Sequence, residues 1–540
     1  MKFIKNPILP GFNPDPSILR VGDDYYIATS TFEWWPGVQI HYSRDLRHWK
    51  LLVQPLKNVS QLDLHGVSDS GGVWAPDLSH DGSRFRLVYT NVKHWAKDST
   101  FSDTLNFLVT AEQITGPWSD PVFLNSSGFD PSLFHDDTRR GGTGQEWLLN
   151  MRRDHRLNRN MFSGILLQEF NSERGALVGL PTFIFKGTSL GVTEGPHLYK
   201  HKWNGAWWYY LVVAEGGTEY EHAVTVARSE FLEGPYEVHP DNPLLTSKHE
   251  PALTLQKAGH ASFVETQTGD WYLAHLCGRP LEPPDASNRH CNLGRETALQ
   301  RLVWGADGWP RLGHGKSTPT EDVPAPELED YVFEHDSPRD DFDRPELSNN
   351  FQSLRTPVNE SWLSMTARPG YLRMYGRESL NSRHQQSLIG RRLQCFRATA
   401  ETCVEFEPAS FQQMAGLACI YDTRNWVYLR VSRDENLGKS LAVLMSDNGR
   451  YEEPTDEEIC IEGTPRIFLR VEFERALFRF RYSRDEQIWS AIGPEFLSAK
   501  LSDEHCGGLA FTGTFLALCV QDLTGARLPA DFDYFQYEER

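Results

Sequence analysis

The 540-residue chain has 54 basic and 73 acidic residues, which give it a formal net charge of -19. This balance disfavours nucleic acid and anionic membrane surfaces as partners, because both are recognised largely through positive charge, and it favours a neutral ligand. The length predicts two to four domains. Aromatic residues make up 12% of the chain, which is typical of β structure, of a sugar-stacking surface, or of both.

The N-terminal stretch "MKFIKNPILPGFNPD" is interrupted by Asn6, Pro7 and Pro10, so we expect no signal peptide. No apolar run reaches the roughly 18 residues that a membrane-spanning helix needs. The eight cysteines are scattered, without a C-x-x-C pair. This usage predicts reduced thiols in a cytoplasmic protein.

Five segments in the first 280 residues share one layout: a polar residue, a short apolar run, a turn with Gly or Asp, and an aromatic-rich apolar run. They begin at Asp15, Asp77, Asp130, Glu194 and His260. Each is typical of a β-hairpin, and residues 43–50, 111–120 and 227–237 predict a second hairpin in three units. Chance could produce apolar–turn–apolar segments, but it does not require a polar residue at every head. Repetition without helices therefore predicts a five-bladed β-propeller.

The innermost strand of each propeller blade lines the central channel. The five heading residues are therefore expected around one axial pocket. Four carboxyl groups in one pocket either bind a cation or have perturbed pKa values suited to acid–base chemistry. Glycoside hydrolysis uses such a pair, one carboxyl protonated and one ionised.

Aromatic residues near these positions, including Phe32 and Trp74, are candidates for a sugar-facing surface, with core packing as the alternative. Arg295, in "NLGRETALQRLVW", follows the fifth repeat. It is predicted either to form an exposed ion pair with Glu296 or to bind ligand hydroxyls or a pocket carboxylate.

The chain divides into a propeller over residues 1–314, a linker rich in Pro and acidic residues over 315–337, and a second domain over 338–540. Short alternating runs in the second domain predict an antiparallel β-sandwich. Such a domain is also typical of an independent carbohydrate-binding module, and this alternative stays open.

The motifs "FNPDPSI", "WAPDLS", "FDPSLFHD", "TEGPHLY", "GHASFVE" and "LGRETA", in this order, resemble glycoside hydrolase family 43, specifically its long-chain, two-domain β-xylosidases. The likeness extends to the late "AFTGTF" and "LPADFDYF". It implies Asp15 as the general base, Glu194 as the general acid, and Asp130 as the carboxylate that orients the acid and keeps its pKa raised. The resemblance also implies a sugar subsite lined by Phe32, Trp74, His260, Arg295 and, from the sandwich, Phe511. Asp77 matches no catalytic residue of the family.

The resemblance further implies an inverting, exo-acting enzyme that releases D-xylose from the non-reducing end of β-1,4-xylo-oligosaccharides, with α-L-arabinofuranosidase as a side activity. An enzyme that is mainly an arabinofuranosidase is the nearest alternative. A non-catalytic carbohydrate-binding propeller is a second, but sugar binding alone needs no set of Asp15, Asp130 and Glu194.

A homo-oligomer, dimer or tetramer, is also implied by the resemblance. No cofactor is expected to be required, while a divalent cation such as calcium near His260 is left open. The loop residues Arg152, Arg153 and Asp154 stay outside the predicted site.

Overall fold

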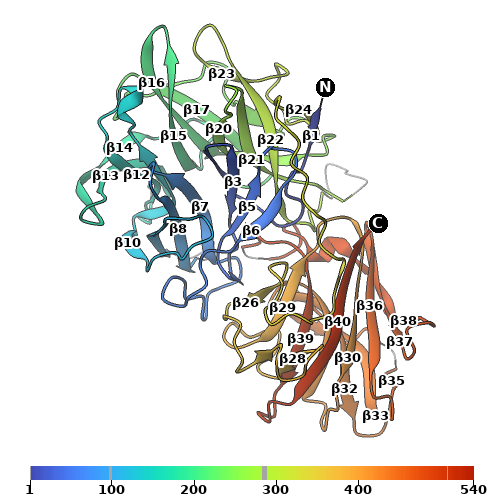
Figure 1. Ribbon diagram of the computed structural model, residues 1–540. Coiled ribbons are helices and arrows are strands. Elements are labelled where there is room, and N and C mark those ends of the chain that lie inside the picture. Colours follow the sequence, from blue (N-terminus) through green and yellow to red (C-terminus); the bar gives the residue numbers. More distant parts are fainter. Residues whose placement is uncertain (1, 96–99, 282–288, 456, 508) are drawn as a thin grey trace.

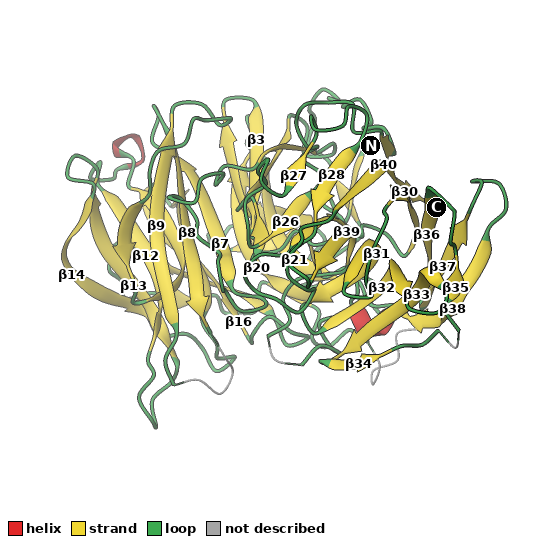
Figure 2. Cartoon of the chain, turned by 90° about the horizontal axis from the view of Figure 1, so that it is seen from below, coloured by secondary structure: helices red, strands yellow, loops and turns green. Residues whose placement is uncertain are grey.

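The computed structural model describes residues 2–95, 100–281, 289–455, 457–507 and 509–540. Strands dominate it, and the helices within these ranges are two short 3-10 turns, Thr138–Arg140 and Ser498–Leu501 (Figure 2). None of the helices in the described part of the chain is long and apolar enough to cross a membrane. The predicted all-β fold is confirmed: a five-bladed propeller (blue to yellow-green in Figure 1) is followed by a β-sandwich (orange and red).

Each blade is an antiparallel sheet whose strands follow one another outward from the axis. Blade one contains β2 (Ser17–Val21), β3 (Asp24–Thr29), β5 (Gln39–Ser43) and β6 (Lys50–Val53). Blade two contains β7 (Gly72–His80), β8 (Phe85–His94), β9 (Asp103–Ala111) and β10 (Val122–Asn125). Blade three contains β11 (Gly128–His135), β12 (Glu146–Arg153), β13 (Phe162–Asn171) and β14 (Ala176–Phe185).

Blade four contains β15 (Glu194–Trp203), β16 (Ala206–Glu215), β17 (Ala223–Ser229), β18 (Glu237–Val238) and β19 (Leu245–Thr246). Blade five contains β20 (Gln256–Glu265), β21 (Trp271–Gly278), β22 (Arg295–Trp304) and β23 (Pro310–Leu312). The innermost strands β2, β7, β11, β15 and β20 contact one another in a ring, because β20 also packs on β2. The chain start is tied down by pairing of β1 (Phe3–Lys5) with β24 (Asp322–Pro324).

The second domain consists of two antiparallel sheets with a shared apolar core between them. The sheet that faces the propeller contains β34 (Arg450–Glu452), β33 (Gly438–Asp447), β32 (Asn425–Asp434), β31 (Gln413–Asp422), β39 (Phe515–Asp522), β29 (Ser387–Arg392) and β26 (Gln352–Leu354), with β35 (Ile459–Cys460) beside β33. The other contains β27 (Leu363–Ser364), β28 (Leu372–Tyr375), β40 (Pro529–Glu539), β30 (Arg397–Glu405), β36 (Ile467–Glu474), β37 (Leu477–Ser483) and β38 (Ser490–Leu497), with β25 (Arg339–Asp340) beside β40.

The two domains share a sheet edge and a hydrophobic core. Strand β4 (Trp34–Trp35), which follows β3 of the propeller, pairs with β26 of the sandwich. Trp34 stacks on Phe515 with ring centroids 3.7 Å apart, and both belong to one buried cluster that spans propeller and sandwich. Burial of such large aromatic surfaces stabilises the contact strongly. The sandwich is therefore held against the end of the propeller that carries the site.

Candidate active site

One residue in or just before each innermost strand has a left-handed backbone. The φ values are 56° at Asp15, 33° at Ala75, 54° at Asp130, 55° at Gly195 and 48° at His260. In blades two to five this position coincides with a β-bulge. Bulges re-aim side chains and are enriched next to active sites, and the five positions with this backbone lie at one end of the propeller axis.

This backbone pattern corrects the repeat register predicted from the sequence. Ala75, not Asp77, is the counterpart of Asp15 in blade two, and Gly195, not Glu194, is the counterpart in blade four. The sequence comparison aligned acidic residues, whereas the bulge lies two residues before Asp77 and one residue after Glu194. Of the five heading residues predicted from the sequence, only Asp15, Asp130 and His260 therefore occupy equivalent backbone positions.

The Asp77 side chain contacts residues of the neighbouring innermost strands. Its Oδ1 accepts a hydrogen bond from Ser17 Oγ over 2.7 Å, and its Oδ2 accepts one from the Leu133 N–H over 2.9 Å. His197 Nδ1 lies 3.5 Å from Oδ1. These contacts tie together the innermost strands of blades one to four, and Asp77 also lines a cavity of about 250 Å³ in the propeller channel.

Asp15 lies two residues before β2, with only 6% of its surface exposed. Ser30 Oγ donates to its Oδ2 over 2.6 Å, and Arg295 Nη1 donates to its Oδ1 over 3.2 Å. His260 Nδ1 lies 3.9 Å from the same Oδ1. Partners from blades one and five therefore fix the orientation of this carboxyl group.

Asp130 and Glu194 lie on adjacent blades, and the N–H of Gly195 donates to Asp130 Oδ2 over 3.0 Å. Burial, reinforced by the charge of Asp15, raises the pKa of Asp130 to about 8, although the Gly195 N–H and Arg295 act in the opposite direction. Burial, followed by the charges of Asp130 and Asp15, holds the pKa of Glu194 well above its usual value. A carboxyl group that keeps its proton near neutral pH can serve as a general acid.

His260 packs against the backbone of blade four. A Cβ atom at Gly195 would lie 2.9 Å from His260 Cε1, so only glycine leaves room for this ring. Burial lowers the pKa of His260 to about 4, with Asp15 acting against this shift and His197 and Arg295 adding to it. The ring is therefore neutral near pH 7 and can donate one hydrogen bond and accept another. Within the described ranges, no group of three or more His, Cys, Asp or Glu side chains is arranged to hold a metal ion.

Phe32, Trp74 and Phe511 form an aromatic wall. The ring centroids of Phe32 and Trp74 are 6.0 Å apart, those of Phe32 and Phe511 6.0 Å, and those of Trp74 and Phe511 5.7 Å. Ser70 holds two of the three: its carbonyl accepts from Trp74 Nε1 over 2.9 Å, and its Oγ accepts from the Phe511 N–H over 3.0 Å. The structure thus brings Phe511 of the sandwich into contact with propeller residues.

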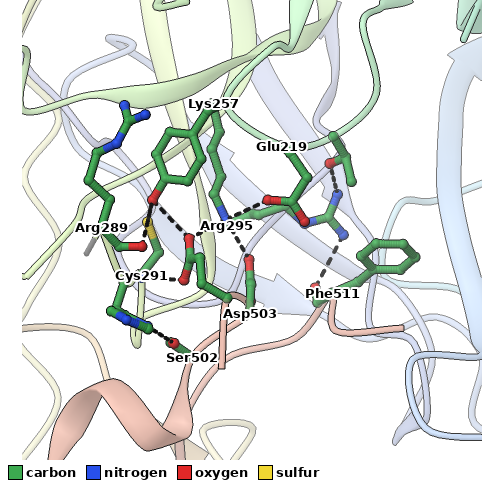
Figure 3. A network of polar contacts seen from close by, with 12 residues as sticks. Glu219, Lys257, Arg289, Cys291, Arg295, Ser502, Asp503 and Phe511 are labelled. Carbon is green, nitrogen blue, oxygen red and sulfur yellow. Dashed lines mark hydrogen bonds and ion pairs between the residues drawn. The ribbon is translucent and has the colours of Figure 1, made fainter. Parts of the chain in front are cut away.

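Arg295 starts β22 and is 4% exposed. Its Nη1 donates to Thr218 Oγ1 over 2.8 Å, and its Nη2 donates to the carbonyl oxygen of Phe511 over 3.2 Å (Figure 3). Glu296 instead accepts from Arg279 Nε over 2.6 Å. The expectation of an exposed pair between Arg295 and Glu296 is wrong, because adjacent residues of a strand point to opposite faces.

The sequence did not single out several residues of the site: Ser30, Ser70, Thr218 and Trp95. Trp95 lies against Trp74, with ring centroids 5.4 Å apart, and the Arg153 guanidinium lies 4.1 Å from the centre of the Trp95 ring. The end of β12 therefore reaches the edge of the aromatic wall. Small polar loop residues carry no pattern that marks them, and Trp95 lies in no repeat motif.

Hydrolysis of a glycosidic bond needs one carboxyl group that donates a proton to the leaving oxygen and a second that assists attack at the anomeric carbon. Glu194 and Asp15 are candidates for such a pair, because both lie at the start of innermost strands next to an aromatic wall suited to a neutral sugar. The class of protein that this arrangement defines is the glycoside hydrolases.

Comparison with known proteins gives the family. The model of Glycosyl hydrolases family 43 matches residues 4–310, and the Beta xylosidase C-terminal Concanavalin A-like domain matches residues 339–538. The chain belongs to glycosyl hydrolase family 43, which confirms the resemblance seen in the motifs.

Three similar proteins cover nearly the whole chain. A beta-xylosidase of Bacillus subtilis (strain 168) is 49% identical over 544 residues, which cover 99% of this chain and 100% of the relative. Xylosidase/arabinosidase 43B of Humicola insolens is 48% identical over 547 residues, covering 99% of this chain and 98% of the relative. The crystal structure of xylan beta-1,4-xylosidase from Bacillus halodurans C-125 matches with a TM-score of 0.95 at 50% identity, covering 99% of this chain and 100% of that structure.

Proposed function

We propose that this glycoside hydrolase is an inverting, exo-acting β-xylosidase that releases D-xylose from the non-reducing end of β-1,4-xylo-oligosaccharides. The observation that carries the proposal is that Glu194, whose pKa is held high by burial and by Asp130 and Asp15, shares one site with an Asp15 oriented by Arg295. The names of the similar proteins support xylose as the sugar. We propose α-L-arabinofuranosidase as a side activity, supported by the double name of the Humicola insolens relative.

In the proposed mechanism Asp15 takes a proton from water while that water attacks the anomeric carbon. Glu194 gives its proton to the glycosidic oxygen on the opposite face as the bond to the leaving sugar breaks. One C–O bond forms, one breaks, and the configuration inverts. Asp15 ends protonated and Glu194 ionised, and exchange with solvent restores both groups.

We propose that Asp130 keeps the general acid, Glu194, protonated by raising its pKa. The Asp130 carboxyl group is held by the Gly195 N–H, and after burial its ionised form is the largest cause that raises the pKa of Glu194. A negative neighbour makes loss of the Glu194 proton less favourable. The Arg295 guanidinium acts in the opposite direction and lowers the pKa of Glu194. The site thus places one positive charge among three carboxyl groups.

The terminal sugar is proposed to lie between His260, Arg295 and the aromatic wall of Phe32, Trp74 and Phe511. Phe511 comes from the second domain and covers one side of the site. Such cover favours a sugar at a chain end over one inside a polymer. The sandwich is therefore proposed to complete the active site and not to act as a separate carbohydrate-binding module.

Product stereochemistry and a substrate panel test this function. Proton NMR of the first xylose released from xylobiose should show the α-anomer, and β-xylose would contradict inversion. Among aryl β-xyloside, aryl α-L-arabinofuranoside and the β-1,3- and β-1,4-linked xylobioses, kcat/KM should be highest for xylosides and for the β-1,4 linkage. A strong preference for the arabinofuranoside would make that the main activity.

We also propose that the enzyme works in the cytoplasm as a homo-oligomer on short oligosaccharides. Its eight cysteines are all free, as is usual where thiols stay reduced. Light scattering of the purified enzyme tests the assembly, and a mass of one chain at working concentration would contradict it.

A further inference from the structure

A lysine lies buried between the two domains beside the site. Lys257 belongs to β20, three residues before His260, and its side chain is 0% exposed. Its Nζ lies 2.7 Å from Glu504 Oε1 and 3.1 Å from Asp503 Oδ2, both in the sandwich, and 3.5 Å from Glu219 Oε2 in the propeller (Figure 3).

An isolated ammonium group is strongly disfavoured in a protein interior, and several partners are needed to offset its desolvation. Here the partners come from two domains. Burial alone would lower the pKa of Lys257, but the charges of Asp503, Glu504 and Glu219 hold it well above its ordinary value. Lys257 therefore stays charged and binds the sandwich segment around residues 503–504 to blade five.

From Lys257 a chain of hydrogen bonds leads to the aromatic wall. Asp503 Oδ1 accepts from the hydroxyl of Tyr421 over 2.6 Å. The same hydroxyl accepts from the N–H of Thr512 over 3.2 Å, and Thr512 directly follows Phe511. Hydrogen bonds and one ion pair thus connect Lys257 on β20 to the residue that follows Phe511.

A second connection runs through blade four. Glu219, the third partner of Lys257, follows Thr218, whose hydroxyl accepts from Arg295 Nη1. Tyr220 donates to Glu504 Oε1 over 2.8 Å. Arg295 therefore binds the loop around Thr218 through Nη1 and the sandwich segment around Phe511 through Nη2. Both parts of the chain also contact Lys257, through Glu219 and through Asp503 and Glu504.

We propose that Lys257 is a positioning residue that fixes the Phe511 segment of the sandwich over the sugar site and thereby sets how tightly the terminal sugar is held. The inference rests on the proposed function in that Phe511 is taken to contact the substrate. Lys257 itself touches neither the sugar nor the reacting atoms.

The test is a double-mutant cycle between Lys257→Met and Phe511→Ala, measured on whichever aryl glycoside the panel shows to be the best substrate. Lys257→Met should lower kcat/KM on the order of tenfold or more, chiefly by raising KM, because displaced groups lose substrate contacts. In the Phe511→Ala background the same change should cost less than about twofold, because coupled sites are non-additive.

Lys200→Met is the matched control. Lys200 is a buried lysine, 4% exposed, whose Nζ lies 2.9 Å from Asp136 Oδ1 within the propeller. This variant should lower the melting temperature while leaving KM unchanged. An equal rise of KM in Lys200→Met would mean that loss of any buried lysine acts through general destabilisation, which overturns the inference.

Tyr421→Phe is a milder change in the same chain of contacts, and it serves as the test if Lys257→Met does not fold. It removes only the hydroxyl that joins Asp503 to Thr512. It should raise KM several-fold, and this rise should disappear with Phe511→Ala. Additive effects of Tyr421→Phe and Phe511→Ala would overturn the proposal. Because the cycle uses the best substrate found, a different preferred sugar would refute the proposed function without affecting this result.

Discussion

The backbone N–H of Gly195 donates a hydrogen bond to Asp130 Oδ2 over 3.0 Å, so the residue after Glu194 binds the carboxyl group that acts on Glu194. This contact joins the bulges of blades three and four. It keeps Asp130 beside Glu194 without a direct bond between the two carboxyl groups. When Asp130 is ionised, its charge raises the pKa of Glu194 further.

Asp130→Asn should move the alkaline limb of the pH profile of kcat/KM to lower pH. Glu194 acts in its protonated form, so activity is present below its pKa and is lost as the pH rises through it. Removing the Asp130 charge takes away a cause that raises this pKa, and the limb should fall on the order of one pH unit. Rates on one aryl xyloside across the pH range give the shift.

Asp77→Asn is the control for this shift. Asp77 is also a buried carboxyl group, 7% exposed, but its partners are Ser17, Leu133 and His197. It should lower stability and leave the alkaline limb in place. If both variants move the limb alike, the shift does not come from the charge beside Glu194.

Glu194→Gln and Asp15→Asn should differ in their dependence on the leaving group. The xylose expelled from xylobiose is a poor leaving group and needs a proton on its oxygen, whereas a dinitrophenolate leaves without one. Glu194→Gln should therefore lose about 10²- to 10⁴-fold on xylobiose and far less on dinitrophenyl xyloside. Asp15→Asn should lose activity equally on both. Equal losses for Glu194→Gln would remove it from the role of the acid.

The sequence was sufficient to predict the residues that follow a recurring local rule. Asp15 and Asp130 each precede a proline near the start of an innermost strand, and both have a left-handed backbone in the structure. The same rule failed at Asp77, because the acidic residue there follows the proline. A repeat found by residue type cannot show which backbone position carries the bulge.

Contacts between distant parts of the chain were beyond the reach of the sequence pattern. Ser70 and Phe511 are 441 residues apart in the chain and share a hydrogen bond. Lys257 lies in no recognisable motif, and only the structure shows that the sandwich places Asp503 and Glu504 beside it. The resemblance to family 43 indicated Phe511, but not the residues that hold it.

Treatment with a chelator should leave kcat/KM unchanged. Arg295 already provides a positive charge at Asp15, 3.2 Å from its Oδ1, and burial keeps His260 neutral with a pKa of about 4. Activity on an aryl xyloside, measured before and after EDTA and removal of trace metal, tests this expectation. A loss that calcium restores and magnesium does not would instead assign a cation to the neighbourhood of His260.

Gly195→Ala should impair catalysis and stability together. Gly195 has a φ of +55°, and an added Cβ would lie 2.9 Å from His260 Cε1, so the imidazole must move and the N–H to Asp130 with it. Gly191→Ala separates strain from this clash, because Gly191 has a φ of +72° but no atom within 4 Å of a Cβ. Both variants should lower the melting temperature, since left-handed alanine is unfavourable. Only Gly195→Ala should also lower kcat/KM, by about 10-fold or more because small displacements of aligned groups are costly; equal kinetics for the two variants would show that the packing of His260 on Gly195 does not matter for the reaction.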